Sequence, residues 1–238
     1  LGGGDLNALF GIAGFAGGIG FGTIFLKKGY SLQRTYALSK LESAMMPAIQ
    51  VGLLVLVVTA PAFIFFSQKG PGAMHAPWLI SLAAGLVVGG LSQFSRLCTV
   101  GGFRDLFLFK KSILIFGYLA VLVGVFVVNI SFGNFHLGFE NQPIAHTDGL
   151  WNFLGMALAG FCSVLLGGCP LRQLIMTGEG NSDAAVTVLG LAAGAAFAHN
   201  FGLAASGAGP TLNGQIAVGV GFVVALIIAI VNTKRVNA

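Results

Sequence analysis

Long stretches without a charged side chain dominate this chain of 238 residues. A hydrocarbon core of about 30 Å is crossed by roughly 20 apolar residues in a helix. The first five stretches hold one such helix each, and the last holds two because the turn-rich segment 205–215 interrupts it. The sequence therefore predicts an all-α, multi-pass membrane protein with seven spans, in the uncharged stretches 6–26, 43–68, 70–95, 112–139, 149–171 and 184–233.

The composition agrees with this prediction, since 56% of the residues are hydrophobic, 8% are charged and the mean hydropathy is +0.91. A soluble globular chain is excluded on these values. The 37 glycines suit helices that pack closely, and the 21 phenylalanines suit surfaces that face lipid. The formal net charge of +5 does not indicate nucleic acid, because the 12 lysines and arginines are spread along the chain without a basic cluster.

The basic residues fall almost entirely on one side of the predicted membrane. Lys69 alone lies in a loop on the other side. The positive-inside rule then places the basic side and the carboxyl terminus in the cytoplasm, which suits a bacterial inner-membrane protein. The eleven residues on the cytoplasmic side are Lys27, Lys28, Arg34, Lys40, Arg96, Arg104, Lys110, Lys111, Arg172, Lys234 and Arg235.

The segment GGCPLRQ, residues 167–173, predicts a helix that starts inside the membrane. Two glycines loosen the preceding span, and Pro170 suits the first position of a new helix, which leaves Cys169 at the N-cap. The free backbone amides and the positive end of that helix, with Arg172 one turn on, favour an anion beside the thiol. The alternative is a simple kink with a buried cysteine that only packs.

The segment FSRLCTVGGFRD, residues 94–105, again combines cysteine, arginine and glycine at membrane depth. Ionisable side chains there are costly and indicate function. Cys98 is flanked by Arg96, Gly101, Arg104 and Asp105, and we expect Asp105 to pair with one of the two arginines. Packing alone remains the alternative for this cysteine as well.

The segment GEGNSD, residues 178–183, follows the second motif directly. It can be a plain turn in which Ser182 or Asp183 caps the next helix. It can also order the cytoplasmic mouth beside Arg172 through Glu179, Asn181 and Asp183. His199 either hydrogen-bonds between helices or lines the path.

Other candidate residues have a structural interpretation. Cys162 lies about 10 Å along a helix from Cys169, too far for a disulfide, and is interpreted as packing. His136 and His146 lack a third ligand at metal spacing, so no metal site is expected. The small-xxx-small ladders at Gly14, Gly18 and Gly22, at Gly85 and Gly89, and at Gly190 and Gly194 predict helix contacts.

Four segments of the chain resemble the YeeE/YedE membrane family, and most closely its YedE-type selenium transporters. They are FSRLCTVGGFRDLFLFK (94–110), GPGAMHAP (70–77), ENQPIAHTDGLWNFLG (140–155) and LLGGCPLRQLIMTGEGNSDA (165–184). The resemblance implies an inverted-repeat transporter built with broken or re-entrant helices. It assigns residues 1–75 to the end of the first half and 76–238 to the second half with both cysteine motifs. Because GGDLNA at 3–8 resembles the start of the family's second element, it also implies that an amino-terminal portion is missing.

The same resemblance implies a path along which cysteine thiols pass a thiosulfate-like anion, and Cys98 and Cys169 match its motif cysteines. A cytoplasmic sulfurtransferase-like carrier protein is the implied recipient. We therefore expect an inner-membrane permease for a small sulfur- or selenium-containing anion, with no cofactor and no catalysed reaction. The expected substrate-binding residues are Cys98, Cys169, Arg172, Arg96, Gly101, Gly168 and Gln173, supported by Arg104, Asp105, Glu179, Asn181, Asp183 and His199.

Two other functions remain open from the sequence. A membrane thiol oxidoreductase needs a cysteine pair that can close, and since no C-x-x-C is present only contact between Cys98 and Cys169 provides one. A channel for a small uncharged solute explains the apolar path but leaves the arginines unexplained. ATP coupling within this chain is not expected, because the sequence has no G-x-x-x-x-G-K-[ST] motif.

Overall fold

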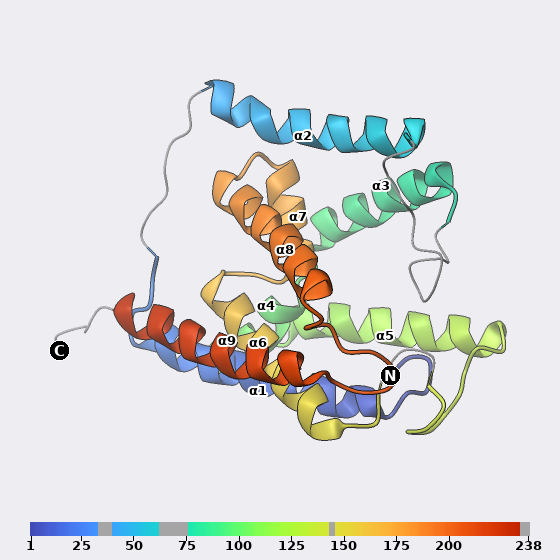
Figure 1. The fold of residues 1–238 in the computed structure, drawn as a ribbon, viewed down its shortest axis with the longest axis vertical. Coiled ribbons are helices and arrows are strands. Elements are labelled where there is room, and N and C mark those ends of the chain that lie inside the picture. The colour runs from blue at the N-terminus through green and yellow to red at the C-terminus, as the bar shows by residue number, and fades with distance from the viewer. Residues whose placement is uncertain (33–39, 62–75, 143–145, 234–238) are drawn as a thin grey trace.

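The computed structural model describes residues 1–32, 40–61, 76–142 and 146–233. Within these ranges the chain forms nine helices and no strand, which confirms the predicted all-α fold (Figure 1). The helices are α1 (Asn7–Lys27), α2 (Lys40–Thr59), α3 (Trp78–Ser95), α4 (Thr99–Phe109), α5 (Ile113–Ser131), α6 (Gly149–Leu165), α7 (Pro170–Gly178), α8 (Ser182–Asn200) and α9 (Leu212–Val231).

Six stretches of the described chain are long and apolar enough to cross a membrane. Two of them each join two helices, α3 with α4 and α6 with α7. The six stretches are Asn7–Lys27, Trp78–Phe109, Ile113–Ser131, Gly149–Gly178, Ser182–Asn200 and Leu212–Val231.

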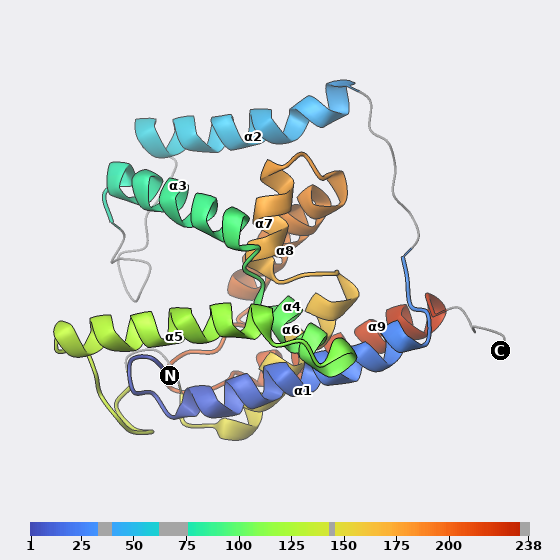
Figure 2. The ribbon, with the colours of Figure 1, turned by 180° about the vertical axis from the view of Figure 1, so that it is seen from behind.

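The seventh predicted span, 43–68, corresponds only in part to α2. Its continuous apolar part, Pro47–Thr59, is shorter than the other six, and residues 62–68 lie outside the described ranges. Figures 1 and 2 show α2 apart from the helices around α1 and α6 in both views.

Helices α1 and α6 form the closest packed pair of the fold, and they run in the same direction. A Cβ atom on Gly14 would lie 2.1 Å from the Phe153 carbonyl oxygen, and one on Gly18 would lie 1.9 Å from that of Ala157. The contacting residue numbers rise together along both helices, so the pair is parallel. Only glycine allows backbones to approach this closely, and the predicted role of the first ladder is confirmed.

The other two predicted ladders do not make helix contacts. Within the described part of the chain, no atom lies within 4 Å of a Cβ built on Gly85, Gly89, Gly190 or Gly194. The prediction is therefore wrong for these glycines. A small-xxx-small spacing permits a close neighbour but does not bring one.

The remaining helices surround this pair. Helix α6 also packs against α9, where Phe161 and Leu165 form a buried cluster with Ala225 and Ala229. Helix α4 packs against α5 and α1, and α7 packs against α8. The short helices α4 and α7 thus lie on different neighbours, and their amino-terminal ends meet beside α1.

We expect Gly18→Ala to destabilise the protein, because the added methyl group would collide with backbone rather than with a side chain that can move. Overpacking of this kind costs about 1–3 kcal/mol. Thermal unfolding of the purified protein in detergent should show a lower midpoint. The matched control is Gly85→Ala in α3, which meets open space and should be neutral or gain up to about 1 kcal/mol from helix propensity. Equal midpoints for the two variants would contradict the assigned contact.

Candidate functional site

The first break in a long helix lies between α3 and α4. Arg96 ends α3 in the left-handed conformation, with φ 52°, and Cys98 is the extended N-cap residue of α4. The Cys98 sulfur accepts a hydrogen bond of 3.2 Å from the backbone N–H of Gly101. The thiol therefore takes the place of the preceding helical carbonyl that this amide lacks.

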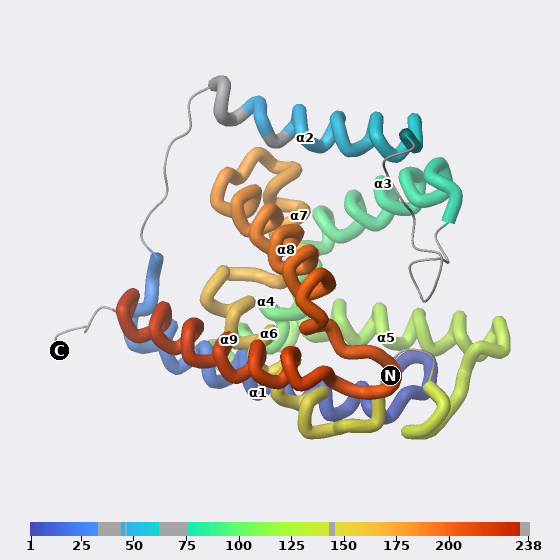
Figure 3. The backbone as a smooth tube through the Cα atoms, in the orientation of Figure 1, coloured from blue at the N-terminus to red at the C-terminus, as the bar shows by residue number. Residues whose placement is uncertain are grey.

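The second break lies between α6 and α7 and has the predicted form. Gly167 is left-handed, with φ 82°, Pro170 is the first residue of α7, and Cys169 is its N-cap residue. The Cys169 sulfur accepts the backbone N–H of Arg172 at 3.4 Å. Figure 3 traces the chain as it leaves the coil of α6, crosses as an extended segment and coils again as α7.

The two thiols meet between these helix ends. Cys98 and Cys169 pack together in one buried cluster, close enough for their thiols to interact, and Thr99 lies close to the Cys169 sulfur. Both cysteines are buried, with 8% and 3% of their surface exposed, and both are free thiols. The amino-terminal ends of α4 and α7 thus converge on one pair of sulfur atoms.

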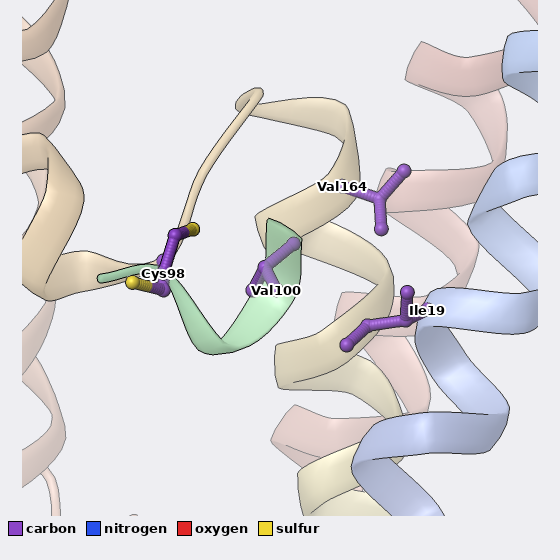
Figure 4. Packing of buried hydrophobic residues seen from close by; sticks show 5 residues of the cluster. Ile19, Cys98, Val100 and Val164 are labelled. Atoms are coloured by element: carbon purple, nitrogen blue, oxygen red, sulfur yellow. The ribbon is translucent and has the colours of Figure 1, made fainter. Parts of the chain in front are cut away.

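An apolar layer closes one side of the thiol pair. Ile19 of α1, Val100 of α4 and Val164 of α6 belong to the same buried cluster as the two cysteines. Figure 4 shows Val100 pointing toward Val164 and Ile19, with Cys98 beyond Val100. Apolar side chains of the α1–α6 pair therefore cover the sulfur atoms on this side.

This arrangement is suited to a soft anion. Backbone amides at helix starts, together with the positive ends of two helices, attract negative charge, and low surrounding polarity strengthens the attraction. The thiols offer polarizable contacts in the same place. Nothing in the geometry requires a metal, and no cluster of three or more His, Cys, Asp or Glu side chains that could hold one occurs in the described residues.

Arg172 reaches the site with its backbone rather than with its guanidinium. The guanidinium donates to Gln93 Oε1 at 3.2 Å and lies 3.7 Å from Glu179 Oε2. Gln93 in turn donates to the Glu179 carboxylate. The predicted proximity of Glu179 and Arg172 is thus present in the structure, and Gln93 of α3 joins them.

The glycines and Gln173 surround the two breaks. A Cβ on Gly101 would lie 3.4 Å from the Cys98 sulfur and 3.2 Å from Leu114, so this position is crowded. Gly168 lies against Arg172 and Gln173. Gln173 is buried, and its amide donates to the Leu166 carbonyl at 3.1 Å, which ties the crossing segment to α7.

Arg104 and Asp105 pair with each other at 2.9 Å, as one of the two predicted alternatives requires. Arg96 is exposed and forms no ion pair with any residue that the structure describes. The structure therefore places Arg96 at the break itself, where its left-handed backbone turns the chain, and places Arg104 in the second turn of α4.

The remaining supporting residues lie at the ends of α8. The N-cap residue is Asn181, whose side chain accepts the backbone N–H of Ala184 at 2.9 Å, so the helix is capped but the predicted capping residue, Ser182 or Asp183, is wrong. Asp183 is exposed in the first turn, and His199 is exposed in the last turn. The structure does not bring His199 to the thiol pair.

Two residues of the site were absent from the sequence predictions. Thr99 contacts Cys169 across the two breaks, and Gln93 bridges Arg172 and Glu179. The polar pair Ser92-Gln93, at the end of an otherwise apolar helix, was the available signal. Cys162, by contrast, packs with Phe161 and Leu165 in the other cluster, as expected.

Residues 94–234 match the family model for sulphur transport. That range covers more than half of the chain and holds both cysteine breaks. The chain belongs to the sulphur transport family. This confirms the resemblance to the YeeE/YedE family, and together with the long apolar helices it assigns the protein to membrane transport of sulfur compounds. No curated protein and no solved structure matches the chain.

We expect Gln173→Leu to loosen the crossing segment of this sulphur transport family member, because the Leu166 carbonyl would lose its donor. A hydrogen bond of this kind contributes about 0.5–1.5 kcal/mol. The thermal unfolding midpoint in detergent should fall accordingly. Leu174→Met, one position further along α7 on an exposed side chain, is the control and should leave the midpoint unchanged. A Gln173→Leu protein as stable as the parent would contradict this role.

Proposed function

We propose that the protein is an inner-membrane permease that passes a small sulfur- or selenium-containing anion along the Cys98 and Cys169 thiols toward the cytoplasm. The observation that carries the proposal is the convergence of two helix N-termini on a contacting thiol pair. An anion that enters there exchanges water for backbone amides and thiol S–H groups.

The chemistry of the pair favours passage over tight retention. Each sulfur already accepts an amide of its own helix, at 3.2 Å for Cys98 and 3.4 Å for Cys169. An arriving anion must share these donors, so each contact is individually weak. Several weak sites in series let an ion move on, whereas one strong site would trap it.

The proposed orientation of the path in the membrane is supported by the charge distribution. The basic residues at the carboxyl-terminal end of α1 and around α4 belong to the side that the positive-inside rule makes cytoplasmic. The parallel run of α1 and α6 is consistent with that topology, since both are expected to enter from the outer side. A cytoplasmic sulfurtransferase-like protein with a reactive thiol is the proposed recipient.

We expect Cys169→Ser in the intact protein to reduce uptake of radiolabelled thiosulfate and selenite by cells by about tenfold or more. A hydrogen bond to a charged group contributes about 1.5–3 kcal/mol, and a hydroxyl replaces the soft sulfur poorly. The matched control is Cys162→Ser, which lies in the other cluster and should transport normally. Membrane insertion is measured by immunoblot, so that a loss of protein is not scored as a loss of transport.

The double variant Cys98→Ser/Cys169→Ser tests the thiol path as a whole. It should show no uptake above that of cells without the protein. Transport by this double variant would refute a path along the thiols, and the ratio of thiosulfate to selenite uptake by the parent would identify the preferred anion.

A second function, thiol oxidoreduction, is favoured by one observation, the contact between Cys98 and Cys169. Closing the pair would release two electrons and two protons, which a membrane quinone can accept to become the quinol. This is the pairing that the absence of a C-x-x-C motif left open.

The two functions differ in the state of the thiols during turnover. For a permease we expect both cysteines to remain free while substrate is transported. Rapid alkylation during uptake, followed by mass spectrometry without reductant, should find both sulfurs modified. A disulfide that accumulates with added quinone and disappears with quinol would instead establish the oxidoreductase.

A further inference from the structure

Three side chains form a closed ring at the edge of the thiol site. Arg172 in the first turn of α7 donates to Gln93 of α3, Gln93 donates to Glu179 at the end of α7, and Glu179 faces Arg172 again. Arg172 and Glu179 lie seven residues apart, on the same face of the short helix. Gln93 therefore ties the carboxyl-terminal end of α3 to α7.

The ring engages a full positive charge, the Arg172 guanidinium, that begins beside the thiols. The backbone amide of Arg172 donates to the Cys169 sulfur, so the Arg172 side chain starts next to the anion path. In this structure the guanidinium is directed to Glu179 and Gln93 instead. The Glu179 carboxylate thus occupies the guanidinium for which a transported anion would compete.

The ion pair is loose enough to be exchanged. The separation is 3.7 Å, against 2.9 Å for Arg104 and Asp105. The Arg172 and Glu179 side chains are 26% and 37% exposed, so water screens their attraction. Pairs of this kind contribute little to stability, and a second carboxylate or oxyanion can displace the first.

We propose that Glu179 is a resident competitor anion that holds Arg172 until the transported anion displaces it. This inference rests on the proposed function and assigns a charge-selective gate to the same site. When the anion takes the guanidinium, Glu179 and Gln93 lose their shared partner, and the tie between α3 and α7 is released. A neutral solute has no charge with which to displace the carboxylate, so the ring stays closed to it.

The test is the apparent KM for radiolabelled thiosulfate uptake by the intact protein in cells. Glu179→Gln removes the competing charge and should lower KM by about twofold to fivefold, which corresponds to loss of a weak ion pair. Glu140→Gln is the matched control, because it removes the same charge from an exposed position in the loop before α6. It should leave KM unchanged.

Gln93→Leu provides a second variant that keeps every charge. It frees one side of the guanidinium and cuts the tie to α3, so KM should again fall. A KM that is unchanged or raised in Glu179→Gln overturns the gate, and so does an equal fall in Glu140→Gln, because the effect would then be one of net charge. A fall in Glu179→Gln alone, with Gln93→Leu unchanged, overturns the role of the ring.

The proposed gate and the proposed permease function are contradicted by different results. If Cys169→Ser transports thiosulfate normally, the proposed function fails and the gate with it. If uptake depends on Cys169 while KM does not respond to Glu179→Gln, the gate alone is wrong and the thiol path stands.

Discussion

A helix that starts again inside a membrane-length segment must find acceptors for its first backbone amides, because lipid offers none. Here the acceptor at both restarts is a cysteine sulfur, at 3.2 Å for Cys98 and 3.4 Å for Cys169. The need to pair these first amides therefore places a thiol at the positive end of each of the two helices. Each cysteine both caps a helix and offers a thiol to the anion, so a substitution at either one affects the stability of the fold as well as transport. Measuring membrane insertion alongside uptake distinguishes the two effects.

The position of the thiols depends in turn on the α1–α6 pair. Gly14 and Gly18 let the two backbones approach until only glycine fits, and this brings Ile19 and Val164 to the back of the cysteines. Wider spacing of these helices would admit polar atoms or water behind the sulfur. The glycine ladder and the motif cysteines, although distant in sequence, thus serve one site.

The α7 restart could be predicted from the sequence because its signals are local: Gly167 and Gly168 end one helix, and Pro170 begins the next. The α4 restart was not predicted residue by residue. Its turn depends on a left-handed arginine, Arg96, where glycine is the usual choice, and on a cysteine N-cap, which no propensity scale favours.

Contacts between distant segments were harder to predict than the breaks. Nothing local to residue 98 indicates residue 169 as its neighbour, and the sequence could state that contact only as a condition for oxidoreduction. Gln93 was missed for the same reason, since its two partners lie in α7. The helix contacts predicted at Gly85 and Gly190 are absent for a related reason. The spacing of glycines makes one helix face suitable for close packing but does not show which helix, if any, packs against it.

The direction of the Arg172 side chain affects how selectivity can arise. If the guanidinium faced the thiols permanently, a full positive charge in a dry site would hold an anion strongly and slow its release. With the charge shared by Glu179 and Gln93, the resting site offers only amide dipoles and sulfur, which favour soft anions weakly. Recruiting the arginine as the anion reaches the thiols would add charge recognition there without making that charge a permanent trap. Amide dipoles and thiols already favour a soft anion, and a recruitable cation strengthens the discrimination between an ion and a neutral molecule of the same size.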